Sequence, residues 1–498
     1  MSKTIIIIGA GLAGLSAALQ AAENGCNVKL VSSLPSERAQ SVMAEGGINA
    51  ALNTKDENDS PEEHFTDTIK AACGLADPNA VWGMTQAAPE LVHWLLKLGV
   101  KFNMSGYDDV DLRNFGGQKK KRTAFAQSDT GKQIMTAMID AVRRKEASGM
   151  VERFSHHSFL TLRLCGNICC GCVIRDEYSQ ETVELPGDAV IVATGGMHGL
   201  FGNTTGSLSN TGEVTAELFR LGVPLANGEM IQYHPTTVKC GGKRMLISEA
   251  ARGEGGRLFA MKDGKQWYFM EEKYPELGNL MPRDITAREI WKVSHESEVF
   301  LDMTEISEEI ISNKLSGLAD DCMTYLHKDI RKEPVSVLPG IHYFMGGILV
   351  DEQHRTPIQN LYAAGECCAQ YHGANRLGGN SLLGALYGGR VAAKSACEQA
   401  DVVDLSCATQ IDFPPASQIS EIKQLNKVMQ ETMGVVRNEN TLLNGIQTVQ
   451  ALTGNLPLLG MAVLKSALAR KESRGAHWRE DYPKSNDDDY LKTTVARF

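Results

Sequence analysis

Features that define several classes of protein are missing from this 498-residue chain. No continuous apolar run reaches the roughly 18–20 residues that a membrane-spanning helix needs, so no segment is expected to cross a bilayer. The N-terminal apolar tract, MSKTIIIIGAG, runs directly into a glycine motif without a cleavage site, which indicates a strand rather than a signal peptide. We therefore expect a cytoplasmic protein that reaches a membrane only through other subunits.

Basic residues are too few for a nucleic-acid-binding protein. Only 50 Lys and Arg stand against 60 Asp and Glu, a net charge of −10, whereas a nucleic-acid partner needs a basic face. Small acidic ligands are still compatible, because a local cluster of arginines can outweigh the overall sign. The 43% hydrophobic and 22% charged residues are typical of a globular protein, and the length predicts several domains.

A disulfide framework and a metal site are not expected either. Twelve cysteines in a chain of this length indicate reduced thiols. Four of them cluster at Cys165, Cys169, Cys170 and Cys172, but the apolar alternation around Gly166–Asn167 predicts two strands and a turn. Since alternate strand residues point to opposite faces, the four sulfurs should not converge on a metal or an iron–sulfur cluster.

The N-terminal residues predict a dinucleotide-binding unit. A strand, a Gly9-x-Gly11-x-x-Gly14 turn, a helix of small residues and a second strand follow one another. Gly9 permits the tight turn, Gly11 lets the backbone approach a pyrophosphate, and Gly14 lets the helix pack on the strand. Ser32 and Ser33 stand where NAD-binding proteins carry a ribose-binding acid, which disfavours NAD.

Further glycine-rich turns indicate that later segments return to this cofactor-binding unit. The loop around Gly46 and Gly47 combines glycines with small residues and can lie flat against a planar ring. A buried strand over residues 189–196 ends in a glycine turn, and LYAAGE ends at Glu366, whose carboxylate can accept from a ribityl or ribose hydroxyl. The expected fold class is α/β, with a Rossmann-like cofactor domain.

The order of these motifs predicts a discontinuous cofactor domain. Residues 1–227 and 339–405 are expected to form it, residues 228–338 an inserted α+β capping domain, and residues 406–498 a C-terminal helical domain. Residues 410–422 carry two prolines and several polar residues, which indicates a linker. The highly charged end, ARKESRGAHWREDYPKSNDDDY, is expected to be a solvated surface or a subunit contact.

The stretch HGANRLGGNSLLGALYGGR places Arg376 just before Gly378 and Gly379. A glycine-rich turn that opens a helix presents backbone N–H groups to a ligand, and an arginine beside it can hold a carboxylate by two parallel hydrogen bonds. Other Gly- or Pro-bounded motifs supply two histidines and two more arginines. Together they suggest a pocket for a small dicarboxylate, built from His234, Ser248, Glu249, Arg252, Arg283, His342 and Arg376.

The motifs GAGLAGLSAA, MAEGGINAAL, FGGQ, ATGG, QYHPT, EAARGEGG, PRD, HYFMGG, HGANRLGGNSLL and KESRGAHWREDYP occur in this order. In identity and spacing they resemble the flavoprotein subunits of succinate dehydrogenase and fumarate reductase over essentially the whole chain. The resemblance implies an FAD-dependent enzyme that interconverts fumarate and succinate by hydride transfer at flavin N5. It also implies that the electron partner is a separate iron–sulfur subunit.

The resemblance implies roles for the site residues. Arg283 transfers the proton to or from the substrate, and Glu249 and Arg252 relay that proton. The substrate contacts are His234, Ser248, His342 and Arg376, and Ser248 stands where relatives usually carry threonine. FAD contacts are expected at Gly9, Gly11, Leu12, Ala13, Gly14, Ser32, Ser33, Ser41, Ala44, Glu45, Gly46, Gly47, Thr194, Gly195, Gly196, Glu213, Tyr343, Glu366, Arg376, Asn380, Ser381 and Leu382.

One position departs from the respiratory members of this family. They usually carry a histidine, bonded covalently to the flavin, where this chain has Gln40. Glutamine cannot form that bond, so we expect non-covalent FAD, whose lower potential favours fumarate reduction.

Two other interpretations exist. The missing histidine also fits L-aspartate oxidase, although FGGQ and HGANRLGGNSLL match the dehydrogenase and reductase pattern better. A non-catalytic flavoprotein scaffold is disfavoured, because Arg283, Glu249 and Arg252 are all present.

Overall fold

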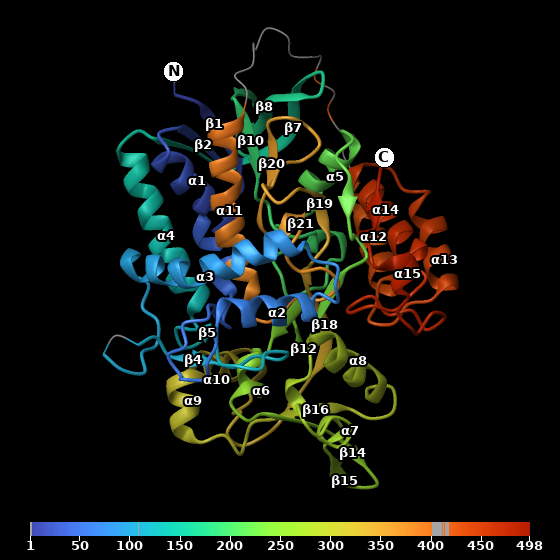
Figure 1. Ribbon diagram of the computed structural model, residues 1–498. Helices are drawn as coiled ribbons and strands as arrows, with labels where there is room; N and C mark the ends of the chain where they lie inside the picture. The colour runs from blue at the N-terminus through green and yellow to red at the C-terminus, as the bar shows by residue number, and fades with distance from the viewer. Residues whose placement is uncertain (1, 108, 401–410, 412, 414–417) are drawn as a thin grey trace.

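The computed structural model describes residues 2–107, 109–400, 411, 413 and 418–498 (Figure 1). Its central layer is a five-stranded parallel sheet, in which strands from both expected parts of the cofactor domain are neighbours. The strands are rich in Ile and Val and are buried, as expected for a parallel sheet that is covered on both faces. In sheet order they are β20 (Leu361–Ala363), β10 (Ala189–Val192), β1 (Thr4–Ile8), β2 (Asn27–Ser32) and β6 (Val151–Ser155).

Helices and a small antiparallel sheet cover the two faces of this central sheet. Helices α1 and α11 run side by side (Figure 1) and come close enough that a Cβ on Gly389 would lie 2.3 Å from the Ala13 carbonyl oxygen. The helices are α1 (Leu12–Glu23), α4 (Thr130–Ala147) and α11 (Asn380–Gln399). The covering strands are β7 (His157–Cys165), β8 (Ile168–Asp176) and β9 (Thr182–Pro186).

The cysteine-rich stretch forms the predicted hairpin, because β7 and β8 pair antiparallel across the turn. Cys169 and Cys172 are fully buried in the packing beneath the central sheet. Ten of the described cysteines are free thiols. Cys165 is disulfide-bonded, so the expectation of reduced thiols is wrong at that position.

The middle block has its own hydrophobic core and lies at the bottom of Figure 1. Strand β12 (Ile231–Cys240) pairs antiparallel with β18 (Leu338–Phe344), so the two ends of the block are joined at its border with the cofactor half. The other strands are β13 (Lys243–Leu246), β14 (Arg257–Lys262), β15 (Lys265–Trp267), β16 (Val299–Asp302) and β17 (Val335–Ser336). The helices are α6 (Glu249–Gly253), α7 (Phe269–Lys273), α8 (Arg283–Val293), α9 (Glu308–Lys314) and α10 (Ser316–Asp321).

Short elements complete the frame around the cofactor half. Between residues 61 and 98 the chain forms two helices, each with Pro at its first turn and a capping side chain before it. These helices are α2 (Pro61–Ala71) and α3 (Pro78–Leu98), and α5 (Glu213–Arg220) follows later. The short strands are β3 (Ile48–Asn49), β4 (Leu112–Arg113), β5 (Thr123–Ala124), β11 (Leu225–Ala226), β19 (Gly347–Leu349) and β21 (Cys368–Ala369).

The C-terminal region is helical and packs beside α5 (Figure 1). Its elements are α12 (Ile419–Thr432), α13 (Glu439–Val449), α14 (Asn455–Ala469), α15 (Asp487–Tyr490) and β22 (Val495–Ala496). The domain boundary expected at residues 405–406 lies outside the described residues, as does most of the expected linker. The last residues of that linker, 419–422, instead begin α12, which is capped by Gln418 and Glu421.

The charged end of the chain is a solvated surface only in its second part, where most of residues 480–490 are exposed. In the first part, Arg470, Glu472, Arg474 and Arg479 are buried. They pair with one another, with backbone carbonyls and with Glu229, to which Arg470 donates at 2.7 Å. Because each buried charge has a partner, these residues form part of the interior, and the expectation of a solvated surface is wrong for them.

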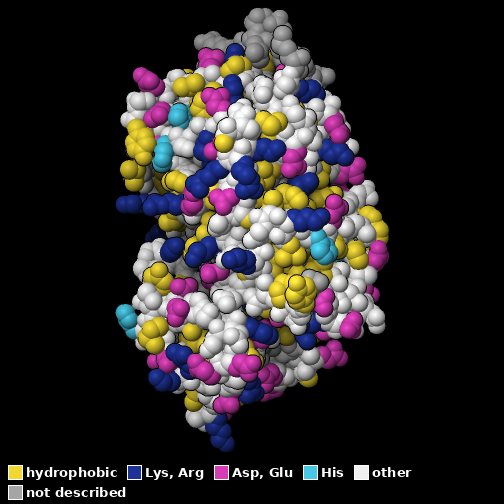
Figure 2. Space-filling model, turned by 90° about the vertical axis from the view of Figure 1, so that its left-hand side faces the viewer, with side chains coloured by type: hydrophobic (Ala, Val, Ile, Leu, Met, Phe, Trp, Pro, Cys, Tyr) yellow, Lys and Arg dark blue, Asp and Glu magenta, His cyan; other side chains and the backbone are white. Residues whose placement is uncertain are grey.

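The face of the molecule shown in Figure 2 carries both signs of charge, with Lys and Arg lying among Asp and Glu. Among the residues that the structure describes, no helix has the length and apolar character of a membrane span.

Candidate functional site

A cavity of about 570 Å³ lies where the carboxyl ends of β1, β2 and β10 meet the middle block. This edge of a parallel sheet is where α/β proteins bind their ligands. Gly9, Gly11 and Ser32 line one end of the cavity, and Arg283 and Arg376 line the other.

The nucleotide end is shaped by backbone. Gly9 has φ +111°, and a Cβ there would lie 2.2 Å from the Ala193 carbonyl oxygen, so the turn excludes any other residue. Beside Gly11, by contrast, a Cβ would have no neighbour nearer than 3.8 Å, which leaves room for a ligand at the N-terminus of α1. The buried hydroxyl of Ser32 has no hydrogen-bond partner. An open helix N-terminus with an unpartnered hydroxyl nearby fits the pyrophosphate and ribose of a dinucleotide.

Most of the residues expected to contact FAD line this cavity. They are Gly9, Gly11, Leu12, Ala13, Ser32, Ser33, Ser41, Ala44, Glu45, Gly46, Gly47, Thr194, Gly195, Glu213, Tyr343, Glu366, Arg376, Ser381 and Leu382. Three lie behind the wall instead. A Cβ on Gly14 would lie 1.8 Å from the Gly9 carbonyl oxygen, and one on Gly196 would meet Phe344. Asn380 bonds to Asn49 and His64. These three residues shape the wall and do not face the cavity.

The loop at Gly46–Gly47 is held flat by its neighbours. Gly47 has φ +132°, and a Cβ there would lie 2.5 Å from the Ala124 carbonyl oxygen. Arg113 donates to the carbonyl oxygens of Gly46 at 2.9 Å and Glu45 at 3.0 Å. The Phe115 ring packs against Gly46. This arrangement leaves a flat surface on the cavity side, where a planar ring system fits.

Glu45 is the unusual group in this loop. Its Oε2 atom is buried without a hydrogen-bond partner. Burial, together with the nearby Asp321 carboxylate, raises the pKa of Glu45 to about 8. The side chain is therefore neutral at pH 7, and it lines the cavity between the nucleotide end and the charged end.

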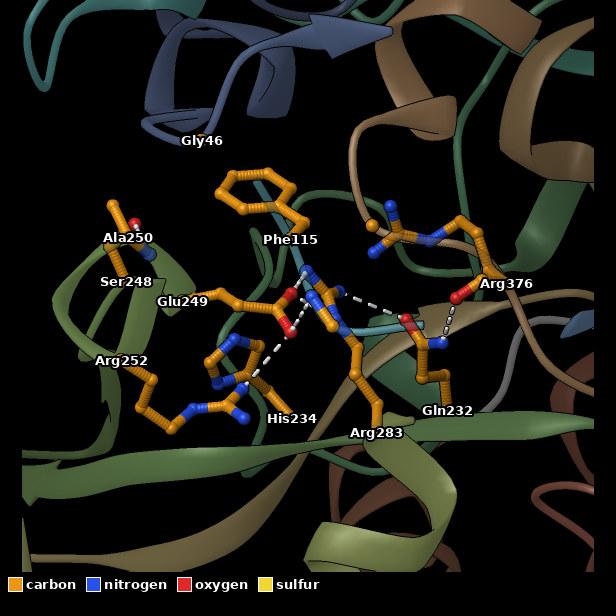
Figure 3. A network of polar contacts seen from close by, with 12 residues as sticks. Gly46, Phe115, Gln232, His234, Ser248, Glu249, Ala250, Arg252, Arg283 and Arg376 are labelled. Atoms are coloured by element: carbon orange, nitrogen blue, oxygen red, sulfur yellow. Dashed lines mark hydrogen bonds and ion pairs between the residues drawn. The ribbon is translucent and has the colours of Figure 1, made fainter. Parts of the chain in front are cut away.

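The charged end centres on a carboxylate between two guanidinium groups (Figure 3). Arg283 donates to Glu249 Oε2 from Nε at 2.8 Å and from Nη2 at 2.6 Å. Glu249 Oε1 accepts from Arg252 Nη2 at 3.2 Å and from the Gly116 N–H at 3.1 Å. Burial works to raise the pKa of Glu249, but Arg283 and Arg252 outweigh it and hold this pKa below its usual value. Glu249 is thus a buried carboxylate in direct contact with both arginines.

Two helix N-termini position this group. Helix α6 begins at Glu249, with the Ser248 hydroxyl accepting from the Ala250 N–H as its cap. Helix α8 begins at Arg283, immediately after Pro282, whose fixed φ suits the start of a helix. Arg252 lies one turn further along α6 and donates to the Asn279 carbonyl oxygen at 2.7 Å. It does not line the cavity, so it reaches the site only through Glu249.

Arg376 lies on the opposite side of Arg283 from Ser248 and Glu249 (Figure 3). Its guanidinium carbon stacks 4.3 Å from the centre of the Tyr343 ring. Burial, and then the nearby positive charge of Arg283, lowers the pKa of Arg376 to about 9. Its Nε is buried and has no hydrogen-bond partner. A buried, charged and unsatisfied guanidinium that faces a cavity is suited to bind an anion.

Two histidines, the buried His234 and the half-buried His342, complete the charged end. The rings of His234 and His342 lie 5.1 Å apart, edge to face, and both line the cavity. Burial, followed by the charge of Arg283, lowers the pKa of each histidine well below its usual value. The Thr205 hydroxyl bonds to His342 Nδ1 at 2.8 Å. Both rings are therefore neutral near pH 7 and can hydrogen-bond a ligand without adding charge.

Sequence reasoning missed Gln232, which links the two arginines (Figure 3). Its Oε1 accepts from Arg283 Nη1 at 3.1 Å, and its Nε2 donates to the Arg376 carbonyl oxygen at 2.8 Å. The available signal was its place two residues before His234, since residues i and i+2 of a strand share a face. Phe115 was noticed only as part of a loop, and nothing in the sequence indicated that its ring would meet Gly46.

Two family models match the chain. One, described as FAD binding domain, covers residues 4–382, and the other, described as fumarate reductase flavoprotein C-term, covers residues 453–498. The succinate dehydrogenase flavoprotein subunit of Bacillus subtilis is 39% identical, over 99% of this chain and 94% of that protein. The fumarate reductase flavoprotein subunit of Haemophilus influenzae is 31% identical, over 99% and 91%.

Solved structures of similar proteins share this fold over most of their length. A mutant of the E. coli quinol fumarate reductase protein FrdA superposes with a TM-score of 0.90 at 28% identity, covering 100% of this chain and 94% of that one. Mycobacterium smegmatis Sdh1 gives a TM-score of 0.83 at 29% identity, covering 98% and 90%. The agreement extends over the cofactor half, the middle block and the C-terminal helices.

Proposed function

Because the chain belongs to the family of succinate dehydrogenase and fumarate reductase flavoprotein subunits, which are FAD-dependent oxidoreductases, we propose that it interconverts fumarate and succinate. The observation that carries this proposal is the group of Arg283, Glu249 and Arg376 at one end of the cavity. Three buried cations lie close together there with one carboxylate, so the site has a surplus of positive charge. A small dianion neutralises that surplus.

The substrate is held through its two carboxylates. Arg376 and His342 bind one carboxylate, and His234 and Ser248 bind the other, on the two sides of Arg283. Charge-assisted bonds to an arginine fix the orientation of a carboxylate as well as its position. The neutral histidines add donors without further repulsion between cations, which suits a pocket closed off from water.

FAD, when bound, supplies the two-electron hydride chemistry. In fumarate reduction, a hydride adds to one carbon of the double bond and a proton to the other, which gives succinate. Arg283 is positioned to deliver that proton. Glu249, bonded to both Arg283 and Arg252, then accepts a proton from the Arg252 side and passes it on to Arg283.

We further propose that FAD is bound without a covalent link. Gln40 lines the cavity, and its Oε1 accepts from the Ser207 N–H at 2.7 Å. A glutamine amide is not nucleophilic enough to form the flavin bond of a histidine. Acid precipitation of the purified protein should release all of the yellow colour. Flavin that stays on the polypeptide through a denaturing gel would refute this proposal.

The physiological electron partner is a separate iron–sulfur protein. Among the described residues, no three His, Cys, Asp or Glu side chains gather as metal ligands, and the family relatives are subunits of multi-subunit complexes. As part of the same proposal, the chain resides in the cytoplasm and contacts a membrane only through such partners.

A dye-coupled assay in both directions tests the function. Fumarate should oxidise a reduced viologen dye in the presence of the holoprotein, and succinate should reduce an acceptor dye. Turnover of neither acid would overturn the proposal. Oxygen consumption with L-aspartate would instead identify an aspartate oxidase, for which the absence of the linking histidine is the one favourable observation.

A further inference from the structure

A tight hairpin of the C-terminal region lies directly behind the turn that carries Arg376. Arg474 and His477 pair with each other, with N–H···O distances of 2.8 and 3.0 Å. At the tip of this hairpin, the Ala476 N–H donates to the Ala374 carbonyl oxygen at 2.9 Å. Ala374 and Ala476 share a small buried cluster with Tyr343, the ring on which Arg376 stacks. The hairpin thus bonds to the backbone two residues before Arg376 and belongs to the same buried cluster as the aromatic support of Arg376.

Gly475 fixes the separation between the hairpin and this turn. It has φ +54°, and a Cβ there would lie 2.5 Å from the Ala374 carbonyl oxygen and 2.9 Å from the Ala374 Cβ. From the other side, the Ala374 N–H donates to the Ala72 carbonyl oxygen at 2.9 Å. The turn is therefore enclosed between two backbones, and a shift away from the hairpin would press it against the backbone of Ala72.

Trp478, the residue that follows the hairpin, contacts the helix on the Arg283 side of the site. The guanidinium carbon of Arg288 lies 4.1 Å from the centre of the Trp478 ring. Arg288 lies on α8, whose first residue is Arg283. One short segment, Arg474–Trp478, therefore contacts the turn behind Arg376 and the helix that begins at Arg283.

The hairpin is itself rigidly held. Arg474 binds Glu472 through Nε and Nη2, at 2.8 and 2.9 Å, and donates to the Cys73 carbonyl oxygen at 3.1 Å. His477 is fully buried between Arg437 and the Arg470 carbonyl oxygen. Because the hairpin is anchored on several sides, it can hold the turn that packs against it in a fixed position.

We propose that the segment Arg474–Trp478, which is the hairpin and the residue after it, is a positioning element. It sets the spacing between Arg376 and Arg283 at the substrate site. Gly475 acts on Arg376 through Ala374, and Trp478 acts on Arg283 through Arg288 and α8. The inference rests on the proposed binding of a dicarboxylate at Arg376. It assigns a role in the active site to a C-terminal segment that does not line the cavity.

The first test is Gly475→Ala in the holoprotein. The added Cβ pushes the Ala374 turn, so KM for fumarate and the Kd for malonate, measured by the change in flavin absorbance, should both rise roughly tenfold. The value of kcat should change less than twofold, and FAD content should not change. Gly149→Ala is the matched control, because Gly149 also has positive φ, at +76°, but a Cβ there has no neighbour within 4 Å. Equal KM and Kd values in the two variants would overturn the inference.

Trp478 gives an independent test that does not depend on tolerance of the glycine variant. Trp478→Ala should release α8 and lower kcat severalfold, with a smaller effect on malonate binding. Trp478→Phe, which keeps a ring beneath Arg288, should recover most of the rate. If both variants lose the same activity, or if kcat and Kd change only in proportion to a fall in Tm, the hairpin is merely structural.

The wild-type protein separates this inference from the function itself. If wild type binds neither malonate nor fumarate, the proposed function has failed. If wild type binds them and both Gly475→Ala and Trp478→Ala behave like wild type, only the positioning role has failed.

Discussion

The two ends of the cavity are built by different means. At the nucleotide end, backbone makes the shape, and Gly9 and Gly47 are required because a Cβ would collide with a carbonyl oxygen. At the charged end, side chains make the shape, with Glu249 between two arginines and Gln232 joining Arg283 to Arg376. Substitutions at the first end should therefore remove the cofactor, whereas those at the second should leave it bound and impair substrate chemistry.

The largest effect is expected from Gly9→Ala. With φ +111° and the Ala193 carbonyl oxygen 2.2 Å from the new Cβ, the turn before α1 cannot keep its geometry. Flavin per polypeptide should fall to background, and turnover should be lost completely. Gly25→Ala is the control, since its φ is +79° and a Cβ there meets nothing within 4 Å. A yellow, active Gly9→Ala protein would contradict the account of the nucleotide end.

Arg283→Lys should separate the two ends most clearly. Lysine lacks the planar fork that binds Glu249 and Gln232 together, so proton delivery should fail, with turnover falling by about 10³-fold or more. Flavin content and Tm should stay close to those of wild type. Loss of flavin along with activity would mean that the two ends are not independent. Arg331→Lys, at an exposed arginine of the middle block that pairs with Glu308 and Asp329, is the control and should retain turnover.

Arg376→Ala should mainly weaken binding. Removal of a buried partner of a carboxylate costs roughly 2–5 kcal/mol, so the Kd for fumarate or malonate should rise by about 10²-fold. FAD should remain, although Arg376 also lines the wall on the cofactor side. Titration of the flavin absorbance with malonate measures this directly. An unchanged Kd would remove Arg376 from the substrate site.

The smallest expected effect is a change of malonate affinity with pH, caused by the titration of Glu45 and Arg376. Glu45, with a pKa raised to about 8, is neutral at pH 7 and becomes an anion above pH 8. Arg376, with a pKa lowered to about 9, loses its charge above pH 9. Both changes disfavour a dianion, so malonate affinity should be flat below pH 7 and fall as pH rises. Glu45→Gln should abolish the first step, of roughly fivefold, and keep the second. An identical profile in this variant would exclude Glu45 as the titrating group.

The nucleotide end could be predicted from sequence because its requirements are local. A strand, three glycines at fixed spacing and a helix of small residues describe the same few turns in any chain. The charged residues were also predicted, but their mutual contacts were not, because Gln232, Glu249 and Arg283 come from separate elements that only folding brings together. Tertiary packing also explains why Gly14 and Asn380 lie behind the wall.

The clearest error concerned the charged C-terminal segment. Lys, Arg, Asp and Glu are usually exposed, and nothing in the segment alone indicates that Arg470 and Arg474 would find Glu229 and Glu472 in the interior. The pair of Arg470 with Glu229 joins residues far apart in the sequence, whereas Arg474 pairs with Glu472 two positions before it. A contact between distant residues, from the Ala476 N–H to the Ala374 carbonyl oxygen, likewise places the 474–478 segment behind the turn that carries Arg376.

That placement has a consequence for biosynthesis. Trp478 follows Arg376 by about a hundred positions, and a ribosome adds about 5–20 residues per second. The chain thus carries its dinucleotide-binding strands and its substrate arginine for roughly 5–20 seconds before the segment that holds that arginine in place exists. On the proposed positioning role, we expect oxidoreductase activity to begin only after the C-terminal helices have docked.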